Sequence, residues 1–337
     1  MGLVFAATAA VASAATEVQA RAGVAREVAQ YLERDDFAGL ERRYSAALAS
    51  RERLPGGALV ANRMLRSLET ALQPPAVPSA LDPVVARNSA EAFRQSVDAR
   101  AARWVKSAPA SSFAAIVQSE FLLEHGAMYQ RSGAAGGLPA DIERGNAYVE
   151  RARSALERAA VAGKSDPGWY YQMLRIAQVQ AWQPDRFAKL LQQALAADPY
   201  SYDTYLAASE FLLPQVGGSV EALESFARFS AMHTAAGEGA SLYARIYWNA
   251  GDYLGAQLFR LTRADWRLMH QGFEDIVQRY PDAWNLNAFA RFACDAGDKE
   301  TARLVLGRIA NQIEPQAWPS RVEADRCRQW AATAGAK

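Results

Sequence analysis

Residues 244–256 read ARIYWNAGDYLGA, and their spacing decides the fold of the chain. Small and aromatic residues recur there at three- and four-residue steps, as on one face of an α-helix, and a glycine interrupts them. The positions that set the pattern are Ala244, Tyr247, Gly251, Tyr253 and Ala256. They predict two helices joined by a turn at Gly251, because a small residue lets the second helix pack closely and glycine permits a tight turn.

Further copies of this spacing occur along the chain. One copy is Ala290, Gly297 and Ala302, a looser one is Val28, Tyr31, Asp35, Phe37 and Leu40, and the second half of another is Phe187, Leu191, Ala194 and Pro199. In their spacing these segments resemble tetratricopeptide repeats. We therefore predict an all-α protein, an α-α superhelix of tetratricopeptide-like helical hairpins.

Helical periodicity continues outside these copies, and proline and glycine mark the ends of the helical segments. We expect helices over residues 17–33, 37–50, 57–73, 90–107, 112–131, 139–162, 168–181, 185–197, 202–213, 219–234, 238–250, 253–262, 265–280, 284–296, 299–313 and 319–333. The proline-rich stretch 73–83 is the best internal linker. It predicts N-terminal helical hairpins at 16–73 and a helical-repeat domain at 84–337.

Four segments also resemble a bacterial domain-of-unknown-function family with helical repeats. They are Leu213–Ser219 (LPQVGGS), Tyr243–Trp248 (YARIYW), Arg279–Asp282 (RYPD) and Asn287–Cys294 (NAFARFAC), which are similar to the family's LPxWGGS and YARxYW signatures. The resemblance covers roughly residues 165–313. Val216 stands where the family is expected to carry a tryptophan. The resemblance implies a helical-repeat fold and brings no activity with it.

The N-terminus has the pattern of an export signal. Residues 2–12 are uncharged and mostly small or apolar, and Ala12-Ser13-Ala14 provides a cleavage motif before Thr16. Residues 1–15 are therefore expected to be a signal peptide, and the protein to be periplasmic or otherwise exported. Because no basic residue precedes Arg21, either this signal peptide is truncated or the interpretation is wrong. The alternative is a cytoplasmic protein whose first helix is rich in alanine.

Composition argues against several classes of function. The 37 basic and 36 acidic side chains give no overall field that would attract nucleic acid. The apolar N-terminal run is shorter than the roughly 20 residues of a membrane-spanning helix, and no later segment qualifies. The three histidines, His125, His233 and His270, lack zinc-ligand spacing. We expect no metal, no cofactor and no transmembrane segment.

Cys294 and Cys327 are the only cysteines and lie about one repeat apart. Equivalent helices of adjacent repeats stack side by side, so a disulfide is conceivable if the two Cα atoms come within about 7 Å. Two buried free thiols are the favoured interpretation, because cysteine is among the most buried residue types.

The candidate binding residues surround the same YARIYW segment. They are Tyr243, Arg245, Tyr247 and Trp248, together with Asp265, Trp266, Trp284 and Asn285. On a helix Tyr243 and Tyr247 share a face and Arg245 points elsewhere. Arg245 is either packed near a turn acid, which is the favoured interpretation, or lines a groove where its guanidinium grips a carboxylate.

Other clusters of polar or aromatic residues have a structural interpretation. Asp35-Asp36 and Asp295 with Asp298 sit where turns and helix caps favour aspartate. His125 next to Glu124 is read as a surface or half-buried histidine. A second aromatic cluster, expected mainly in the core, comprises Trp169, Tyr170, Tyr171, Tyr200, Tyr202 and Tyr205.

Two functions from different classes remain open at this point. The leading hypothesis is a non-catalytic helical-repeat scaffold that binds a protein, a peptide or an envelope component. The alternative is an enzyme or a carbohydrate-binding protein that uses an aromatic and acidic hollow in a helical toroid. In that alternative the first suspects are Asp265, Trp266 and Trp284. No set of catalytic residues is recognised in the sequence.

Overall fold

The computed structural model describes residues 15–71, 82–134, 139–310 and 312–333, and over these residues the chain is an all-α superhelix of packed hairpins without a β-strand. The helices are α1 (Glu17–Glu33), α2 (Phe37–Ser50), α3 (Val60–Ala71), α4 (Pro83–Ser107), α5 (Ser112–Ala134), α6 (Pro139–Arg158), α7 (Ala160–Gly163), α8 (Pro167–Val179), α9 (Pro184–Ala197), α10 (Tyr202–Phe211), α11 (Val220–Glu238), α12 (Ser241–Leu254), α13 (Leu258–Leu261), α14 (Trp266–Arg279), α15 (Ala283–Asp295), α16 (Lys299–Ile309) and α17 (Arg321–Ala332). The prediction of an all-α superhelix is confirmed.

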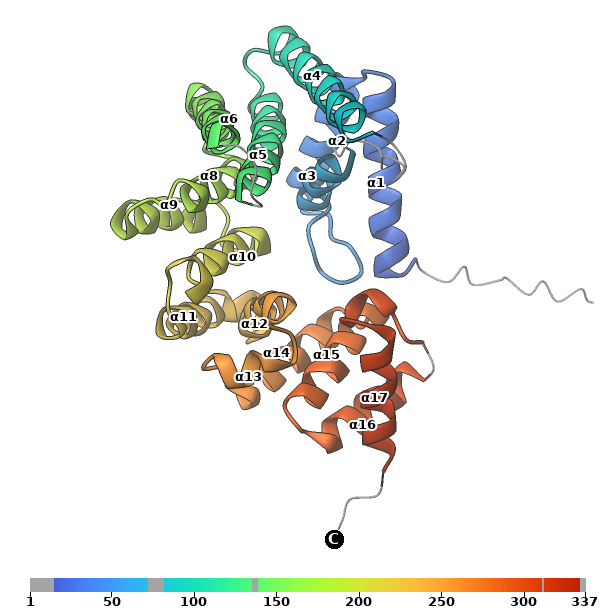
Figure 1. The fold of residues 1–337 in the computed structure, drawn as a ribbon. Helices are drawn as coiled ribbons and strands as arrows, with labels where there is room; N and C mark the ends of the chain where they lie inside the picture. The colour runs from blue at the N-terminus through green and yellow to red at the C-terminus, as the bar shows by residue number, and fades with distance from the viewer. Residues whose placement is uncertain (1–14, 72–81, 135–138, 311, 334–337) are drawn as a thin grey trace, which may run out of the picture.

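The hairpins follow one another around a ring, so that α15 comes back to α1 (Figure 1). From α1 to α3 the chain leads through α5 and α9 to α12, and α15 then returns to contact α1. The loop between α2 and α3 reaches toward the middle of the ring. A single hydrophobic core continues through both regions that the proline-rich stretch was expected to separate, from Val28 and Tyr44 to Phe273 and Phe292.

Aspartate and other short polar residues begin many of the helices, as expected for N-caps. Asp36 accepts a hydrogen bond from the backbone of Gly39 at 2.8 Å, and Thr16 forms a capping box with Gln19. Two of the predicted hairpin turns are confirmed, since Asp35 and Gly297 adopt positive φ angles of 50° and 75° between paired helices. Backbone geometry thus agrees with the repeat spacing at these turns.

The turn predicted at Gly251 is wrong. Helix α12 continues through Gly251 to Leu254, and the positive φ angle of 57° falls on Gly255. Gly251 instead makes room for a neighbouring helix, because a Cβ atom there would lie 2.9 Å from the ring of Phe292. Gly251 is therefore needed for close packing of the helices and not for a turn. The expected helix 253–262 is replaced by a 3-10 turn and the short α13.

Helix α4 begins seven residues before its expected start at residue 90. Pro83 occupies the first turn and the Asp82 carboxylate accepts a hydrogen bond from the Val85 backbone at 3.3 Å. Proline is compatible with the first turn of a helix, where its missing N–H is not needed, so Asp82-Pro83 was a start signal. The expected linker falls largely on residues 72–81 and the signal peptide on residues 1–14, which both lie outside the described residues.

Five of the six members of the second aromatic cluster pack in the core, as predicted, whereas Tyr200 is half-buried. Trp169, Tyr170, Tyr171, Tyr202 and Tyr205 are buried, with exposed fractions between 0% and 7%. Their hydroxyl or indole groups find local partners where geometry allows, as in the bond from Tyr205 to the Pro199 carbonyl at 2.8 Å. Large aromatic side chains therefore fill the space between hairpins, which positions the inner ends of α10 and α12.

Candidate functional site

The residues that join the two ends of the ring converge on the backbone of one residue in the α2–α3 loop, Gly56. Its N–H donates to Glu17 Oε2 at 2.6 Å, and its carbonyl accepts from Arg245 Nη2 at 3.0 Å and from Asn285 Nδ2 at 3.3 Å. Glu17 belongs to α1, Arg245 to α12 and Asn285 to α15. The loop is therefore held from both ends of the chain, and this places Arg245 at the inner surface of the ring.

A cavity of about 320 Å³ lies beside this closure. Its wall contains four arginines, Arg21, Arg63, Arg66 and Arg245, against two aspartates, Asp203 and Asp252. We call this cavity the arginine hollow. Because arginine stays protonated at all relevant pH values, its lining carries two more positive than negative charges. The hollow therefore favours an anionic group.

The arginines of the hollow differ in the partners that hold them. Arg21 pairs with the buried Glu17 at 2.6 Å, and Arg66 pairs with Asp203 at 2.9 Å. Arg245 forms no ion pair with any carboxylate among the described residues, and its Nε atom is buried without a hydrogen-bond partner. Its charge is balanced only by a backbone carbonyl and by aromatic faces. Arg245 can therefore accept a carboxylate as a further partner.

Aromatic rings complete the wall of the hollow. Trp248 and Trp284 stack with their ring centroids 6.1 Å apart, and the Arg21 guanidinium lies 4.3 Å from the Trp284 centroid. The Arg245 guanidinium lies 4.5 Å from the Tyr202 centroid, a distance suited to a cation–π contact. Burial raises the pKa of the Tyr202 hydroxyl, although the charge of Arg245 opposes that shift. Tyr202 therefore stays protonated and acts as a neutral support.

The predicted binding residues separate into different places. Arg245, Trp248 and Trp284 come together in the arginine hollow, and Asn285 is buried behind it at the Gly56 carbonyl. Tyr243 and Tyr247 point away from Arg245, as predicted, and both donate to Glu224 Oε2 at 2.9 and 2.6 Å. Arg245 combines features of both interpretations, since it donates to a backbone carbonyl and also lines the hollow, and no described turn acid pairs with it.

Burial, reinforced by the Glu224 carboxylate, raises the pKa of both the Tyr243 and the Tyr247 hydroxyl. Each hydroxyl therefore remains a proton donor, and both tyrosines are buried while their acceptor Glu224 is half-buried. Neither tyrosine lines the arginine hollow. The two tyrosines join α12 to α11 and have a structural role in this arrangement.

Asp265 and Trp266 lie at the opposite end of α14 from Trp284. Helix α14 contains 14 residues and so is about 21 Å long, with Asp265 before its first turn and Trp284 beyond its last. Asp265 caps α14 by accepting from the Arg267 backbone at 3.0 Å, and Trp266 Nε1 donates to Asp298 at 3.0 Å. The three suspects of the enzymatic alternative therefore do not share one hollow.

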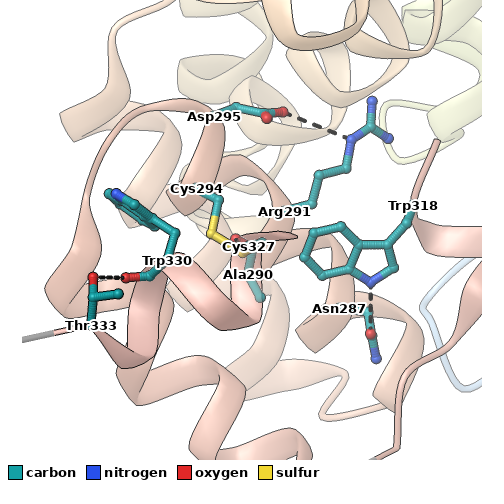
Figure 2. The surroundings of a disulfide bond; sticks show 9 residues. All are labelled: Asn287, Ala290, Arg291, Cys294, Asp295, Trp318, Cys327, Trp330 and Thr333. Atoms are coloured by element: carbon teal, nitrogen blue, oxygen red, sulfur yellow. Dashed lines mark hydrogen bonds and ion pairs between the residues drawn. A yellow bond between two sulfur atoms is a disulfide. The ribbon is translucent and has the colours of Figure 1, made fainter. Parts of the chain in front are cut away.

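The two cysteines are joined as a disulfide, which overturns the preference for two free thiols (Figure 2). Their Cα atoms lie 5.8 Å apart, within the range that a disulfide requires. Cys294 ends α15 and Cys327 lies in α17, so equivalent positions of successive hairpins do meet. The tendency of cysteine to be buried fits both a free thiol and a disulfide. Which of the two forms depends on the distance between α15 and α17, which the sequence does not reveal.

The two aspartates Asp295 and Asp298 have different surroundings. Asp298 caps α16 by accepting from the Thr301 backbone at 3.0 Å, as predicted for a cap. Asp295, in contrast, caps no helix and faces a second cavity near the disulfide. Its pKa is raised to about 6 by burial, with Arg291 opposing the shift. His125, expected at the surface or half-buried, is instead buried with Nδ1 3.1 Å from Asp98 Oδ1.

An arrangement that resembles a catalytic triad occurs at Glu274, His270 and Thr301. The His270 Nε2 atom lies 3.1 Å from the Thr301 hydroxyl and its Nδ1 atom lies 3.9 Å from Glu274. The Thr301 hydroxyl, however, donates its proton to Asp298 at 2.8 Å and is 91% buried as part of a helix cap. A hydroxyl committed in this way is not activated as a nucleophile by His270.

Three arginines of the hollow were missed by sequence reasoning because they come from the N-terminal helices. Arg63 and Arg66 are three residues apart on α3, and Arg21 lies one turn after Glu17 on α1. The spacing of Arg63 and Arg66 was a detectable signal for a basic helix face. Their meeting with Arg245 depends on ring closure, which no local pattern reveals.

Over the described part of the chain, no helix is long and apolar enough to cross a membrane, and no three His, Cys, Asp or Glu residues cluster as metal ligands. Comparisons with protein-family models, curated proteins and solved structures give no match. The resemblance to the bacterial helical-repeat family therefore stays a prediction.

Proposed function

We propose that this protein is a non-catalytic helical-repeat scaffold whose arginine hollow binds a carboxylate-bearing segment of a peptide or protein partner. The observation that carries the proposal is Arg245, which is positioned by the ring closure, lines the cavity and forms no ion pair with a described carboxylate. A carboxylate accepts paired hydrogen bonds from a guanidinium in a geometry that no neutral group matches.

The size and composition of the hollow favour a short part of a larger partner. A cavity of about 320 Å³ lies at the lower end of the 300–1,000 Å³ typical of ligand sites. It can hold one or two side chains. Trp248 and Trp284 offer apolar contact next to the charge, so an acidic side chain followed by an apolar one suits the site best.

The chemistry of the lining supports binding over catalysis. Proton transfer at neutral pH needs a group whose pKa lies near 7, whereas the arginines of the hollow remain charged. Asp203 and Asp252 are each engaged by an arginine, Arg66 at 2.9 Å and Arg291 at 3.0 Å. These charges orient a ligand and offer no acid and base in reach of one another. Export to the periplasm remains part of this proposal, on the N-terminal pattern alone.

The proposal is tested with two labelled peptides and the full chain. One peptide carries two Glu-Leu pairs and the other carries Gln-Leu in their place, and fluorescence anisotropy measures binding at low and high salt. We expect the acidic peptide to bind at least about tenfold more tightly, with the difference falling as salt screens the charges. Equal binding of both peptides, or binding of neither, refutes the carboxylate assignment.

Variants at one position then locate the site. Arg245→Gln should weaken binding of the acidic peptide, whereas Arg245→Lys should retain part of it because the charge remains. Arg260→Gln is the matched control, since Arg260 is exposed and donates only to Gln257 among its described partners. Thermal melting of each variant separates loss of binding from loss of fold.

A further inference from the structure

A second cavity, of about 260 Å³, lies against the disulfide at the other side of α15. We call it the disulfide pocket. Figure 2 shows Trp318 and Trp330 on either side of the Cys294–Cys327 bond, with Asp295 and Arg291 beyond it. Glu323 and Arg326 of α17 complete the polar lining. Arg291 also pairs with Asp252 of the arginine hollow at 3.0 Å, whereas the other groups line the disulfide pocket and not the hollow.

The pocket contains polar groups whose hydrogen-bonding capacity is unused. No donor from the described residues forms a hydrogen bond to Asp295, whose nearest charged neighbour is Arg291 Nε at 3.9 Å. Arg291 is buried, with 4% of its surface exposed. Its Nη1 and Nη2 atoms donate to Asp252 and to the Gly251 carbonyl at 3.0 and 3.1 Å, and only its Nε atom has no hydrogen-bond partner among the described residues. A buried polar group without a partner is costly, so a ligand that supplies both donors and acceptors here is favoured.

The charges of the pocket balance. Asp295 and Glu323 are acidic and Arg291 and Arg326 are basic, so the lining has no net charge and selects neither an anion nor a cation. Hydroxyl groups suit such a lining best, because each can donate to a carboxylate and accept from a guanidinium. The burial that raises the Asp295 pKa to about 6 also leaves this carboxylate poorly solvated and receptive to donors.

Aromatic and apolar surface supplies the remaining contacts. Trp330 is half-buried, and the Trp318 indole is fixed by its Nε1–H donating to Asn287 at 2.9 Å. Aromatic faces pack well against the C–H faces of a saturated sugar ring. A volume of about 260 Å³ is below the usual 300–1,000 Å³ for drug-sized molecules, which favours a ligand of one ring.

We propose that the disulfide pocket binds one hexopyranose ring of an uncharged saccharide. Asp295 and Glu323 accept from its hydroxyls, Arg326 donates to them, and Trp330 packs against its apolar face. The disulfide holds α17, which carries Trp330, to α15 at the wall of the pocket. Carbohydrate binding thus belongs to a different set of residues from Asp265, Trp266 and Trp284.

The test uses saturation-transfer NMR with the full oxidised chain and three neutral probes: methyl α-D-glucopyranoside, methyl β-D-galactopyranoside and N-acetylglucosamine. We expect transfer to the ring protons of at least one sugar, and weaker transfer to charged analogues, glucosamine and glucuronate. Absence of transfer to all three neutral sugars overturns the proposal, and so does a preference for a charged ring.

Variants identify the pocket. Asp295→Asn and Trp330→Ala are each expected to weaken binding of the responding sugar at least about tenfold, because each removes a hydrogen-bonding or stacking partner. Val322→Ala is the control, since Val322 is on the same helix and 65% exposed. Asp295→Asn preserves size, so it remains informative if Trp330→Ala unfolds. Binding that both variants leave unchanged shows that the sugar sits elsewhere and refutes the assignment.

Discussion

Asp282 joins the two ends of the chain through Glu17. The Asp282 Oδ2 atom accepts a hydrogen bond at 3.1 Å from the backbone N–H of Glu17, the first residue of α1, 265 positions earlier. Its other oxygen accepts from the Trp284 backbone at 2.8 Å and caps α15. One carboxylate therefore serves two helix N-termini, whose dipoles both favour negative charge.

Asp282→Ala should destabilise the protein more than the loss of an ordinary helix cap. Removing a cap costs about 1 kcal/mol, so the loss of two contacts is expected to lower the free energy of unfolding by about 2 kcal/mol. Asp36→Ala is the matched control, because Asp36 caps α2 alone. Urea denaturation measures both. An equal loss in the two variants would show that the bond to Glu17 contributes nothing.

Arg245→Ala should lower stability through the ring closure. The variant removes the charged donor to the Gly56 carbonyl and the contact with Tyr202, and bonds from charged groups are worth about 1.5–3 kcal/mol. Calorimetry should show a lower melting temperature, with Arg260→Ala close to the parent protein. A melting temperature unchanged by Arg245→Ala, together with lost peptide binding, would reveal a purely functional arginine.

The sequence predicted the individual helices far better than it predicted the contacts between them. Turns at Asp35 and Gly297 were recognised because positive φ and helix spacing leave local marks, whereas Gly251 carried the same mark for a different reason, the approach of the Phe292 ring. A glycine needed for packing and one needed for a turn look alike in a sequence. Only the neighbouring helix distinguishes them.

Only about half of the candidate site could be predicted from the sequence. Arg245, Trp248 and Trp284 were selected from the C-terminal repeats, but Arg21 and Arg66 reach them across the ring closure. That closure depends on the summed curvature of all intervening hairpins, a property that no window of sequence contains. The same reasoning applies to the disulfide pocket, since Asp295 was read as a cap and its cavity depends on where α17 docks.

Reduction of the disulfide should destabilise the C-terminal hairpin. Cys294 and Cys327 are 33 positions apart, and closing a loop of that length is worth about 3–4 kcal/mol in the chain-entropy treatment. The double variant Cys294→Ser with Cys327→Ser should melt at a lower temperature than the oxidised protein, and dithiothreitol should then have no further effect. If dithiothreitol did not change the melting temperature of the parent protein, the disulfide would add no stability.

Asp295 should make stability depend on pH in a window between about 4 and 6. Its pKa is raised from 3.8 to about 6 in the folded protein, mainly by burial, so the folded state binds a proton more tightly than the unfolded state. The stabilisation is fully present below pH 4 and is lost as the pH rises through 6.

Replacement by asparagine isolates this effect from that of other carboxylates. Asp295→Asn cannot ionise, so the free energy of unfolding of the variant minus that of the parent protein should increase between pH 4 and pH 6.5. A shift of this size corresponds to an increase on the order of 2–3 kcal/mol. Urea titrations at four pH values in this window measure the difference. A free-energy difference that stays constant across the window would mean that Asp295 is as well solvated in the folded chain as in the unfolded one. The disulfide pocket would then lack the poorly solvated acceptor on which sugar binding depends.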